Sequence, residues 1–247
     1  EAKKLAYENR ARLYADPEFS ACSVGGLVAP AHGRSQAARI DPNRAARRPG
    51  ADLPSDTVYV TAVDEDRNAV SLIQSIYYGF GSGVTPPGLG FAMQNRGSLF
   101  ALDAKHANAL APGKRPFHTI IPALVTRGGR AVFPFGVMGG DMQPQGHVQI
   151  LLNLLVGGMD PQEAGDAPRV RHDGSSTPTG DVMRDGGVVH VEPALGGSVA
   201  AGLRKKGHRV EVTAGGYGGY QGIWIDRDTG FLLGGSESRK DGKALGF

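Results

Sequence analysis

The glycine pair Gly139-Gly140 is the first place where residue types and spacing suit chemistry. It separates a strand-like stretch (131–138) from a segment whose apolar residues recur at helical spacing. Backbone N–H groups at such a helix start lie at the positive end of the helix dipole, and they can stabilise the oxyanion that forms when an amide carbonyl is attacked. An ordinary strand-to-helix turn uses the same glycines, so the residues alone leave both interpretations open.

Other sequence signatures of catalytic or binding sites are absent. There is no G-x-x-x-x-G-K-[ST] phosphate loop, no H-E-x-x-H or paired C-x-x-C, and no G-x-S-x-G turn around a serine nucleophile. The seven histidines are scattered and Cys22 is the only cysteine, so neither a zinc site nor an intrachain disulfide is expected. We therefore expect neither a metal nor another cofactor.

The composition is that of a folded globular protein. Of the 247 residues, 40% are hydrophobic and 21% are charged, and the formal net charge is +3. No apolar run is long enough for a membrane-spanning helix. Two short basic clusters lack the interleaved aromatic residues of a single-strand nucleic-acid platform, so we expect neither a nucleic-acid nor a membrane partner. The clusters are Arg44, Arg47 and Arg48, and Arg204, Lys205 and Lys206.

The first half of the chain predicts two helices followed by hairpins. Residues 1–15 favour a helix, and a second short helix is expected after Asp41-Pro42. The inner face of the first helix is expected to carry Leu5, Ala6, Leu13 and Tyr14. Strands are predicted at 57–64 and 68–78 as a hairpin, at 91–95, and on both sides of the R-G-G-R turn within 120–140.

The second half predicts helices and strands in alternation. A helix is expected after Gly140, with an apolar stripe of Val148, Leu151, Leu152, Leu155 and Val156. Asp160-Pro161-Gln162-Glu163 has the pattern of a capped helix start. Strands follow at 188–192 and in H-R-V-E-V, Q-G-I-W-I-D and G-F-L-L-G-G, with a helix at 193–206. The whole predicts an α+β fold of stacked antiparallel sheets covered by helices.

An ordered set of short motifs resembles the γ-glutamyltransferase family of N-terminal-nucleophile hydrolases, in its C-terminal part. The motifs are T-V-Y-V-T-A-V-D-E-D-R-N-A-V-S from Thr57, F-G-S-G-V (80–84), P-G-K-R-P (112–116), G-V-M-G-G (136–140), A-P-R-V-R-H (167–172) and G-G-S-E-S-R-K-D-G (234–242). Each is weak alone, and their common order is specific. The runs Q-N-R-G and K-R-P-F-H-T-I-I-P are more similar to the branch of oxamate amidohydrolases and cephalosporin-acylase-like proteins.

The resemblance implies a four-layer αββα sandwich, here partial because most of the large subunit is missing. Residues 1–56 would be the tail of the large subunit, and residues 57–247 the small, catalytic subunit. Self-cleavage between Asp56 and Thr57 would free the α-amino group of Thr57. That amine, with a pKa of about 7.7–8.0, could activate the hydroxyl of the same residue. Without the resemblance, Thr57 is simply a β-branched residue that opens a strand.

Further catalytic roles follow from the resemblance. Ser75 lies where the family has a second hydroxyl residue, usually threonine, that supports the nucleophile. Gly139 and Gly140 match the family's paired oxyanion glycines. The reaction implied is amide hydrolysis or acyl transfer through an acyl-enzyme.

The substrate-binding positions differ from the family pattern. Tyr77 stands at the family's glutamyl-binding asparagine, and Arg96 and Leu99 stand at the Gln and Asp that bind the amino group. His118 and Thr119 replace a serine pair that binds a carboxylate. Leucine cannot pair with an ammonium group, whereas Arg96 and His118 favour an anion. Structural roles for these two residues, as a loop-fixing arginine and a hydrogen-bonded histidine, stay open.

Three functions remain to be distinguished. The first is a γ-glutamyltransferase-like enzyme acting on glutathione-type compounds or related small anionic amides. The second is an oxamate amidohydrolase or a glutaryl or cephalosporin acylase, and the third is an unprocessed, truncated relative without catalysis. The expected partners are a small amide substrate and the remainder of the large subunit; a higher oligomer stays open. The single thiol fits the cytoplasm, and a periplasmic or secreted location stays open because the chain can begin within a longer protein.

Overall fold

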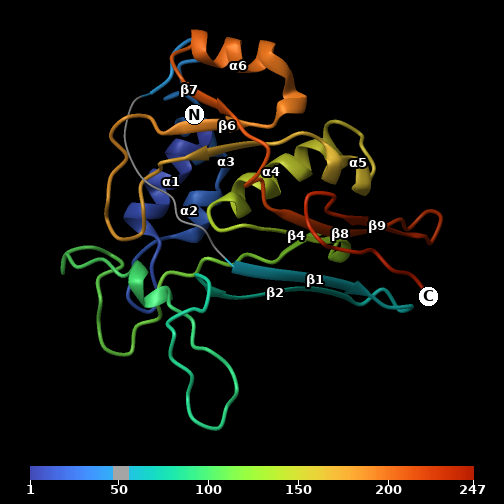
Figure 1. Cartoon of the computed structure of the whole chain (residues 1–247), viewed down its shortest axis with the longest axis horizontal. Coiled ribbons are helices and arrows are strands. Elements are labelled where there is room, and N and C mark those ends of the chain that lie inside the picture. The colour runs from blue at the N-terminus through green and yellow to red at the C-terminus, as the bar shows by residue number, and fades with distance from the viewer. Residues whose placement is uncertain (47–55) are drawn as a thin grey trace. The chain divides into compact units, whose positions relative to one another are not determined.

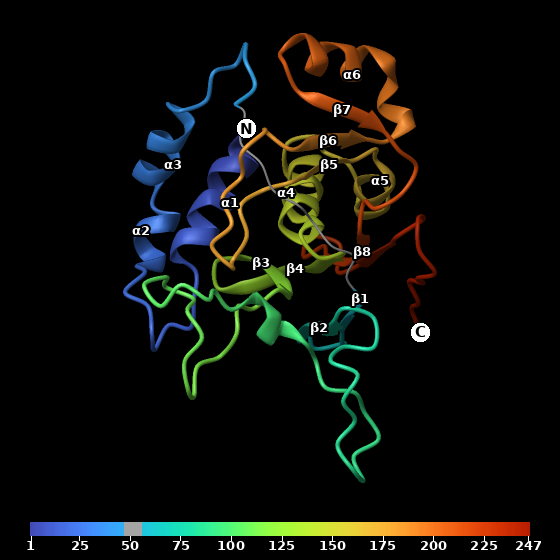
Figure 2. The same ribbon diagram turned by 60° about the vertical axis from the view of Figure 1, so that its left-hand side comes forward.

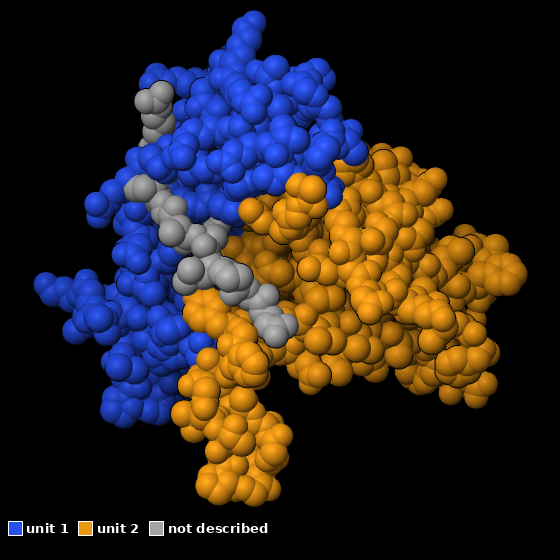
Figure 3. All heavy atoms as spheres, in the orientation of Figure 1, with its two compact units in different colours: residues 1–52, 95–118, 172–213 blue, residues 53–94, 119–171, 214–247 orange. Residues whose placement is uncertain are grey.

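A computed structural model describes residues 1–46 and 56–247 and divides the chain into two compact units (Figure 3). Unit 1 comprises the segments 1–52, 95–118 and 172–213, and unit 2 the segments 53–94, 119–171 and 214–247. The units therefore interleave along the sequence. Arg47 and Arg48 of the first basic cluster lie outside the described residues.

Unit 2 is built on two antiparallel sheets. Their strands are β1 (Asp56–Val63), β2 (Ala69–Tyr77), β3 (Ala123–Arg127), β4 (Arg130–Met138), β8 (Gly219–Ile225) and β9 (Leu232–Ser236). The smaller sheet is the β1–β2 hairpin, and the larger has the strand order β3-β4-β8-β9. The hairpins predicted at 57–78 and around the R-G-G-R turn are confirmed.

The two sheets of unit 2 pack face to face, and helices cover the outer face of the larger one (Figure 1). A side chain at Gly136 of β4 would meet the Tyr59 ring of β1 at 2.5 Å, so the glycine lets the sheets approach closely. Helix α4 (Met142–Leu155) lies on β4, and α5 (Pro161–Asp166) follows it. The shared core contains Phe133, Phe135, Val137, Ile150 and Tyr220. These are three of the four expected layers, and the α+β class is confirmed.

The face of helix α4 that packs on the sheet is not the apolar stripe that the sequence predicted. Gly146 and Ile150 face inward, and a side chain at Gly146 would lie 2.5 Å from Val137 Cγ1. The close approach at Gly146 therefore sets the rotation of the helix. Most of the predicted stripe is more than half exposed, namely Val148, Leu152, Leu155 and Val156, which makes that prediction wrong.

The β1–β2 hairpin also has an exposed apolar face. Tyr59 and Ile73 point into unit 2, whereas the alternate positions are about half exposed. These exposed residues are Val58, Val60, Val70 and Leu72. Unit 2 thus leaves apolar surface open on α4 and on this hairpin.

Unit 1 combines helices with a small sheet (Figure 2). Its helices are α1 (Ala2–Leu13), α2 (Val24–Val28), α3 (Pro30–Ala37) and α6 (Gly196–Lys205), with short 3₁₀ turns η1 (Arg96–Leu99) and η2 (Pro193–Leu195). The sheet order is β5-β6-β7, with β5 (Val170–Asp173), β6 (Val188–Val191) and β7 (Arg209–Val212); the unit boundary falls within β5. β6 and β7 are parallel, unlike the antiparallel sheets expected, because α6 carries the chain back between them.

The predicted inner face of α1 is wrong. The buried face of α1 carries Lys4, Tyr7, Arg10 and Ala11 instead of the predicted apolar set. Lys4 is paired with Glu1 at 2.6 Å, and the Arg10 guanidinium stacks on Tyr7 at 3.8 Å, so both cations are buried with partners.

Two other predicted elements do not form. The residues described directly after Asp41-Pro42, 43–46, form a turn followed by irregular chain instead of a helix, and residues 47–55 lie outside the described part. Residues 91–95 form no strand. They are instead hydrogen-bonded to the glycine-rich loop, where the Ser82 N–H donates to Met93 O at 2.8 Å. The capping box at Asp160 and Glu163 is confirmed, and it starts α5 as predicted. Within the described ranges, no helix has the length and apolar character needed to cross a membrane.

Candidate active site

Thr57 and Ser75 are brought together by the β1–β2 hairpin of unit 2. They are direct partners in the strand register, and Thr57 is only 9% exposed. The Thr57 hydroxyl donates to Ser75 Oγ at 3.1 Å, and the Tyr77 N–H donates to the same oxygen at 2.9 Å. Ser75 therefore orients the Thr57 hydroxyl at the start of β1.

The hairpin is irregular next to Thr57. Asp56 pairs with Tyr77 whereas Thr57 pairs with Ser75, so Ile76 has no opposite residue and forms a bulge. Tyr77 has a φ of +80°, which is rare for a bulky residue, and its ring stacks on Tyr78 at 4.2 Å between centroids. The strain of such a backbone is on the order of 1–3 kcal/mol, and it lies beside the Asp56–Thr57 peptide.

The Gly139-Gly140 turn joins β4 to α4 in unit 2. Both glycines have positive φ, +126° and +57°. Their carbonyls accept from Met142 N at 3.0 Å and Gln143 N at 3.1 Å, so they form the first turn of the helix. Their own N–H groups consequently lie at the positive end of the α4 dipole, and the assignment of an oxyanion site to them stays a prediction.

Two side chains on α4 support this turn, and the sequence analysis did not identify either. Gln143 is 1% exposed, and its Oε1 accepts from the Ile121 N–H at 3.2 Å, two residues after Thr119. His147 Nε2 accepts from the Val137 N–H at 3.0 Å, and burial lowers the pKa of His147 to about 4. His147 is therefore a neutral acceptor that fixes β4 just before the glycine turn. The helical spacing of Gln143 and His147 is the only signal in the sequence that they share a face.

Arg96 and His118 lie in unit 1 and influence one another. Arg96 begins η1 and is 5% exposed, whereas the His118 side chain reaches the surface. Partial burial lowers the pKa of His118, and the positive charge of Arg96 lowers it further. His118 is consequently neutral at pH 7, and Arg96 supplies the positive charge at these predicted anion-binding positions. Leu99, which replaces the family's amino-group-binding Asp, is buried, with only 8% of its surface exposed.

His118 also lines a cavity of unit 1. The cavity has a volume of about 610 Å³, in the range of small-molecule pockets, and lies against the end of α1, α2 and residues 115–118. On its wall, Arg115 holds Asp16 through hydrogen bonds at 3.0 and 3.1 Å, which lowers the pKa of Asp16 to about 2. The wall is otherwise mostly apolar, with Leu13, Leu27 and Phe117 among its residues.

A hydrogen-bonded hydroxyl pair at a strand start and a glycine turn, both on stacked sheets, are the arrangement expected of N-terminal-nucleophile hydrolases. The sequence model of the gamma-glutamyltranspeptidase family matches residues 1–247. The chain belongs to the gamma-glutamyltranspeptidase family, and the resemblance predicted from its motifs is confirmed.

Named relatives agree with this assignment. The chain is 37% identical over 253 residues to the glutathione hydrolase-like YwrD proenzyme of Bacillus subtilis. It is 36% identical over 249 residues to the oxamate amidohydrolase proenzyme of Klebsiella pneumoniae. Each alignment covers 100% of this chain and 46% of the relative, so the chain spans about half the length of these proteins.

A solved structure gives the same result. The crystal structure of cephalosporin acylase from Bacillus halodurans is 42% identical, with a TM-score of 0.84. The match covers 97% of this chain and 42% of that chain. The predicted similarity to the branch of oxamate amidohydrolases and cephalosporin-acylase-like proteins is thereby confirmed.

Proposed function

We propose that the chain is the nucleophile-bearing half of an amide hydrolase or acyltransferase that uses Thr57 after cleavage of the Asp56–Thr57 bond. The observation that carries this proposal is the hydrogen bond from the Thr57 hydroxyl to Ser75 Oγ at a bulged strand start. The proenzyme names of the two curated relatives support a cleaved form. Residues 1–56 then belong to the large subunit, and residues 57–247 form the small one.

The cleavage requires no reagent except water. Thr57 Oγ attacks the Asp56 carbonyl carbon, the C–N bond breaks, and the hydroxyl proton moves to the departing nitrogen. The resulting ester is hydrolysed by water, which leaves a carboxylate on Asp56 and a free amine on Thr57. The strained backbone of Tyr77, which pairs with Asp56, lies opposite the bond that breaks.

The same residue then acts on an external amide. The Thr57 amine accepts the hydroxyl proton, Oγ attacks the substrate carbonyl, and the proton passes to the leaving amine. The Gly139 and Gly140 N–H groups stabilise the oxyanion, aided by the α4 dipole. Water, or a second amine, releases the acyl group from Thr57. Ser75 keeps the nucleophile oriented in both half-reactions.

The family resemblance supports substrate-binding roles for Tyr77, Arg96, His118 and Thr119, each taken position by position from the sequence. Buried Arg96 supports an anionic substrate, and Leu99 offers no carboxylate for the α-amino group of a γ-glutamyl compound. A small anionic amide such as oxamate is therefore favoured over glutathione. A glutaryl or cephalosporin side chain is the acylase variant of the same chemistry.

The partner in this proposal is the remainder of the large subunit. The chain spans about half of its relatives, and the exposed valines of β1 and β2 provide the kind of surface that another polypeptide covers. The competing function is an uncut relative without catalysis. The two differ in whether Thr57 becomes an N-terminus.

Intact-mass analysis and N-terminal sequencing test the proposal directly. The protein from its natural gene should yield a new terminus at Thr57, and Thr57→Ala should stay uncut. Cleaved protein should hydrolyse oxamate faster than γ-glutamyl-p-nitroanilide. An intact Asp56–Thr57 bond in protein that hydrolyses amides would show that the proposed chemistry is wrong, and an intact bond without turnover would favour the competing function.

A further inference from the structure

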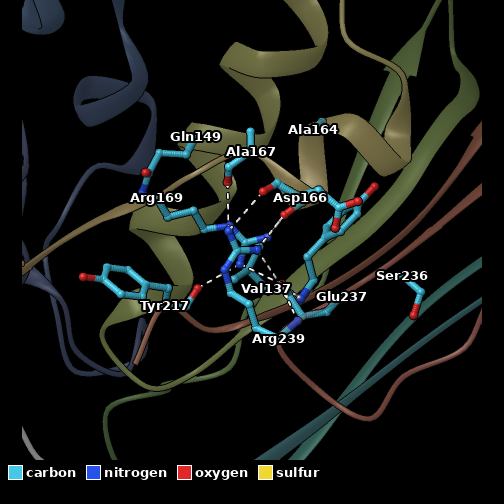
Figure 4. A network of polar contacts seen from close by, with 12 residues as sticks. Val137, Gln149, Ala164, Asp166, Ala167, Arg169, Tyr217, Ser236, Glu237 and Arg239 are labelled. Carbon is cyan, nitrogen blue, oxygen red and sulfur yellow. Dashed lines mark hydrogen bonds and ion pairs between the residues drawn. The ribbon is translucent and has the colours of Figure 1, made fainter. Parts of the chain in front are cut away.

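Two motifs that the catalytic scheme leaves without a role meet in the interior of unit 2. A-P-R-V-R-H supplies Arg169, and G-G-S-E-S-R-K-D-G supplies Glu237 and Arg239. Arg169 is 0% and Glu237 is 2% exposed. One carboxylate oxygen of Glu237 lies 2.8 Å from Arg169 Nη1, and the other lies 2.7 Å from Arg239 Nη1 (Figure 4). A single carboxylate thus bridges two guanidinium groups.

The network ends on backbone atoms of two segments. Arg169 donates to Tyr217 O and to Gly165 O, each at 2.8 Å, and Arg239 donates to Gly165 O at 2.9 Å and to Ala167 O at 3.0 Å. Glu237 Oε2 accepts from the Tyr220 N–H at 2.8 Å. The hydrogen bonds to Tyr217 O and from the Tyr220 N–H lie on either side of Gly218-Gly219. These two glycines are therefore held at both ends.

The held glycines pack on the proposed oxyanion turn. A side chain at Gly139 would lie 3.0 Å from Gly218 Cα, and one at Gly218 would lie 2.6 Å from Met138 O. Gly219 is the register partner of Met138 at the end of β4. Gly218 has a φ of +80°, a conformation that glycine adopts without strain. The segment 217–220 therefore forms the wall against which the Met138–Gly139 peptide rests.

We infer that Arg169, Glu237 and Arg239 are positioning residues that set the direction of the Gly139 and Gly140 N–H groups through Gly218. This inference rests on the proposed function of the glycine turn. Buried charges are costly unless their geometry is nearly ideal, so the network tolerates little movement of the backbone that it binds. An oxyanion donor must lie within a few tenths of an ångström of its required place. If the segment 217–220 is displaced, stabilisation of the transition state should consequently decrease more than the affinity for substrate.

The test compares Glu237→Gln with Arg227→Lys in the cleaved protein. Arg227 is an exposed arginine of unit 2 that donates to Ala131 O, at the opposite end of β4. Glu237→Gln should lower kcat about 30- to 100-fold with KM changed less than about threefold, since removal of an oxyanion donor costs about 10²–10³. Arg227→Lys should leave both constants unchanged. N-terminal sequencing gives the fraction of chains with a free Thr57, so uncut protein is not counted as slow enzyme.

A tetrahedral probe separates positioning from simple loss of folded protein. Methylboronic acid adds to a hydroxyl nucleophile and places an oxygen where the oxyanion forms, whereas the product acid binds without it. Glu237→Gln should weaken methylboronic acid binding by about the factor lost in kcat and leave product inhibition unchanged. Equal changes for both ligands, or none for either, would overturn the inference. Arg239→Lys, whose side chain is 19% exposed, provides the same comparison if Glu237→Gln does not fold.

A readout without turnover distinguishes this inference from the proposed function. In a Thr57→Ala background, amide exchange is followed by mass spectrometry in the peptide covering residues 137–142. Glu237→Gln should accelerate exchange there at least about tenfold relative to Arg227→Lys. Unchanged exchange would show that the network does not hold the turn, whatever the activity of the wild-type protein. A wild-type protein that neither cleaves nor hydrolyses amides would instead contradict the proposed function alone.

Discussion

The two units differ in which candidate residues they hold. Unit 2 holds Thr57, Ser75 and the glycine turn, the positions predicted for catalysis, and Thr57 is hydrogen-bonded to Ser75. Unit 1 holds Arg96 and His118, two of the positions predicted to bind substrate. Under the proposed function, substitutions at Thr57 and Ser75 should therefore affect catalysis, and substitutions at Arg96 should affect the preference for an acyl group.

The largest effect should follow from removing the nucleophile in unit 2. Thr57→Ala should abolish self-cleavage and lower amide turnover by about 10⁴-fold or more, because both reactions need the same hydroxyl. Mass spectrometry and a chromogenic amide assay measure the two losses. Thr57→Ser is the matched control, and it should retain measurable cleavage. Turnover by Thr57→Ala close to that of the wild type would place the nucleophile elsewhere.

Removing the hydroxyl partner should have a smaller effect of the same type. Ser75→Ala deletes the acceptor of the Thr57 hydrogen bond and should lower kcat about 10- to 100-fold, since the nucleophile is less well oriented. Ser75→Thr keeps the acceptor and should restore most of the rate. Steady-state kinetics on fully cleaved protein provides the measurement. If alanine and threonine at this position act alike, orientation by Ser75 is not part of the mechanism.

A change in unit 1 should alter substrate preference instead of the type of reaction. Arg96→Lys keeps the charge but loses the planar guanidinium, and it should raise KM for oxamate about tenfold with little change in kcat. Turnover of a neutral amide should stay constant. A comparable loss of kcat for both substrates would contradict the division of roles between the units. Thermal unfolding of the variant checks that the buried site still folds.

The last expected effect concerns stability and its dependence on pH instead of activity, and each unit provides a histidine for it. Burial lowers the pKa of His147 in unit 2 and of His172 in unit 1 to about 4. Between about pH 6.5 and pH 4 the unfolded chain binds protons that the folded chain does not, so stability should fall as the pH falls through this window. His147 alone accounts for a loss on the order of 3 kcal/mol at most.

Denaturant unfolding at several pH values measures this linkage. His147→Gln keeps an acceptor for the Val137 N–H and should flatten the pH dependence of the transition that involves unit 2. His172→Gln should do the same for unit 1. A pH profile that neither substitution changes would mean that these imidazoles bind protons as readily in the folded protein as in the unfolded chain.

The sequence predicted the parts of the fold that depend on local chemistry. The β1–β2 hairpin, the capping box at Asp160 and the turn at Gly139-Gly140 each have their determinants within a few residues. Motif order then added Thr57 and Ser75, which propensity alone would have treated as strand residues. The hydrogen bond between them depends on the strand register, which the hairpin turn fixes.

The features that could not be predicted depend on contacts between distant segments. The buried face of α1 includes Lys4 and Arg10 because Lys4 donates to Ala46 O and Arg10 donates to Ser176 O, so an apolar pattern was misleading. The rotation of α4 follows from the packing of Gly146 on Val137. The partners of Glu237 are separated from it by as many as 68 residues, and no local periodicity connects them.

The outward apolar stripe of α4 has a consequence for any measurement of this protein's stability. A helix with apolar residues on opposite sides gains free energy whenever another polypeptide covers the side that its own unit leaves bare. Unfolding is then linked to association, and the melting temperature rises with the concentration of the covering chain. A melting temperature quoted without that concentration would therefore not be a property of the fold alone.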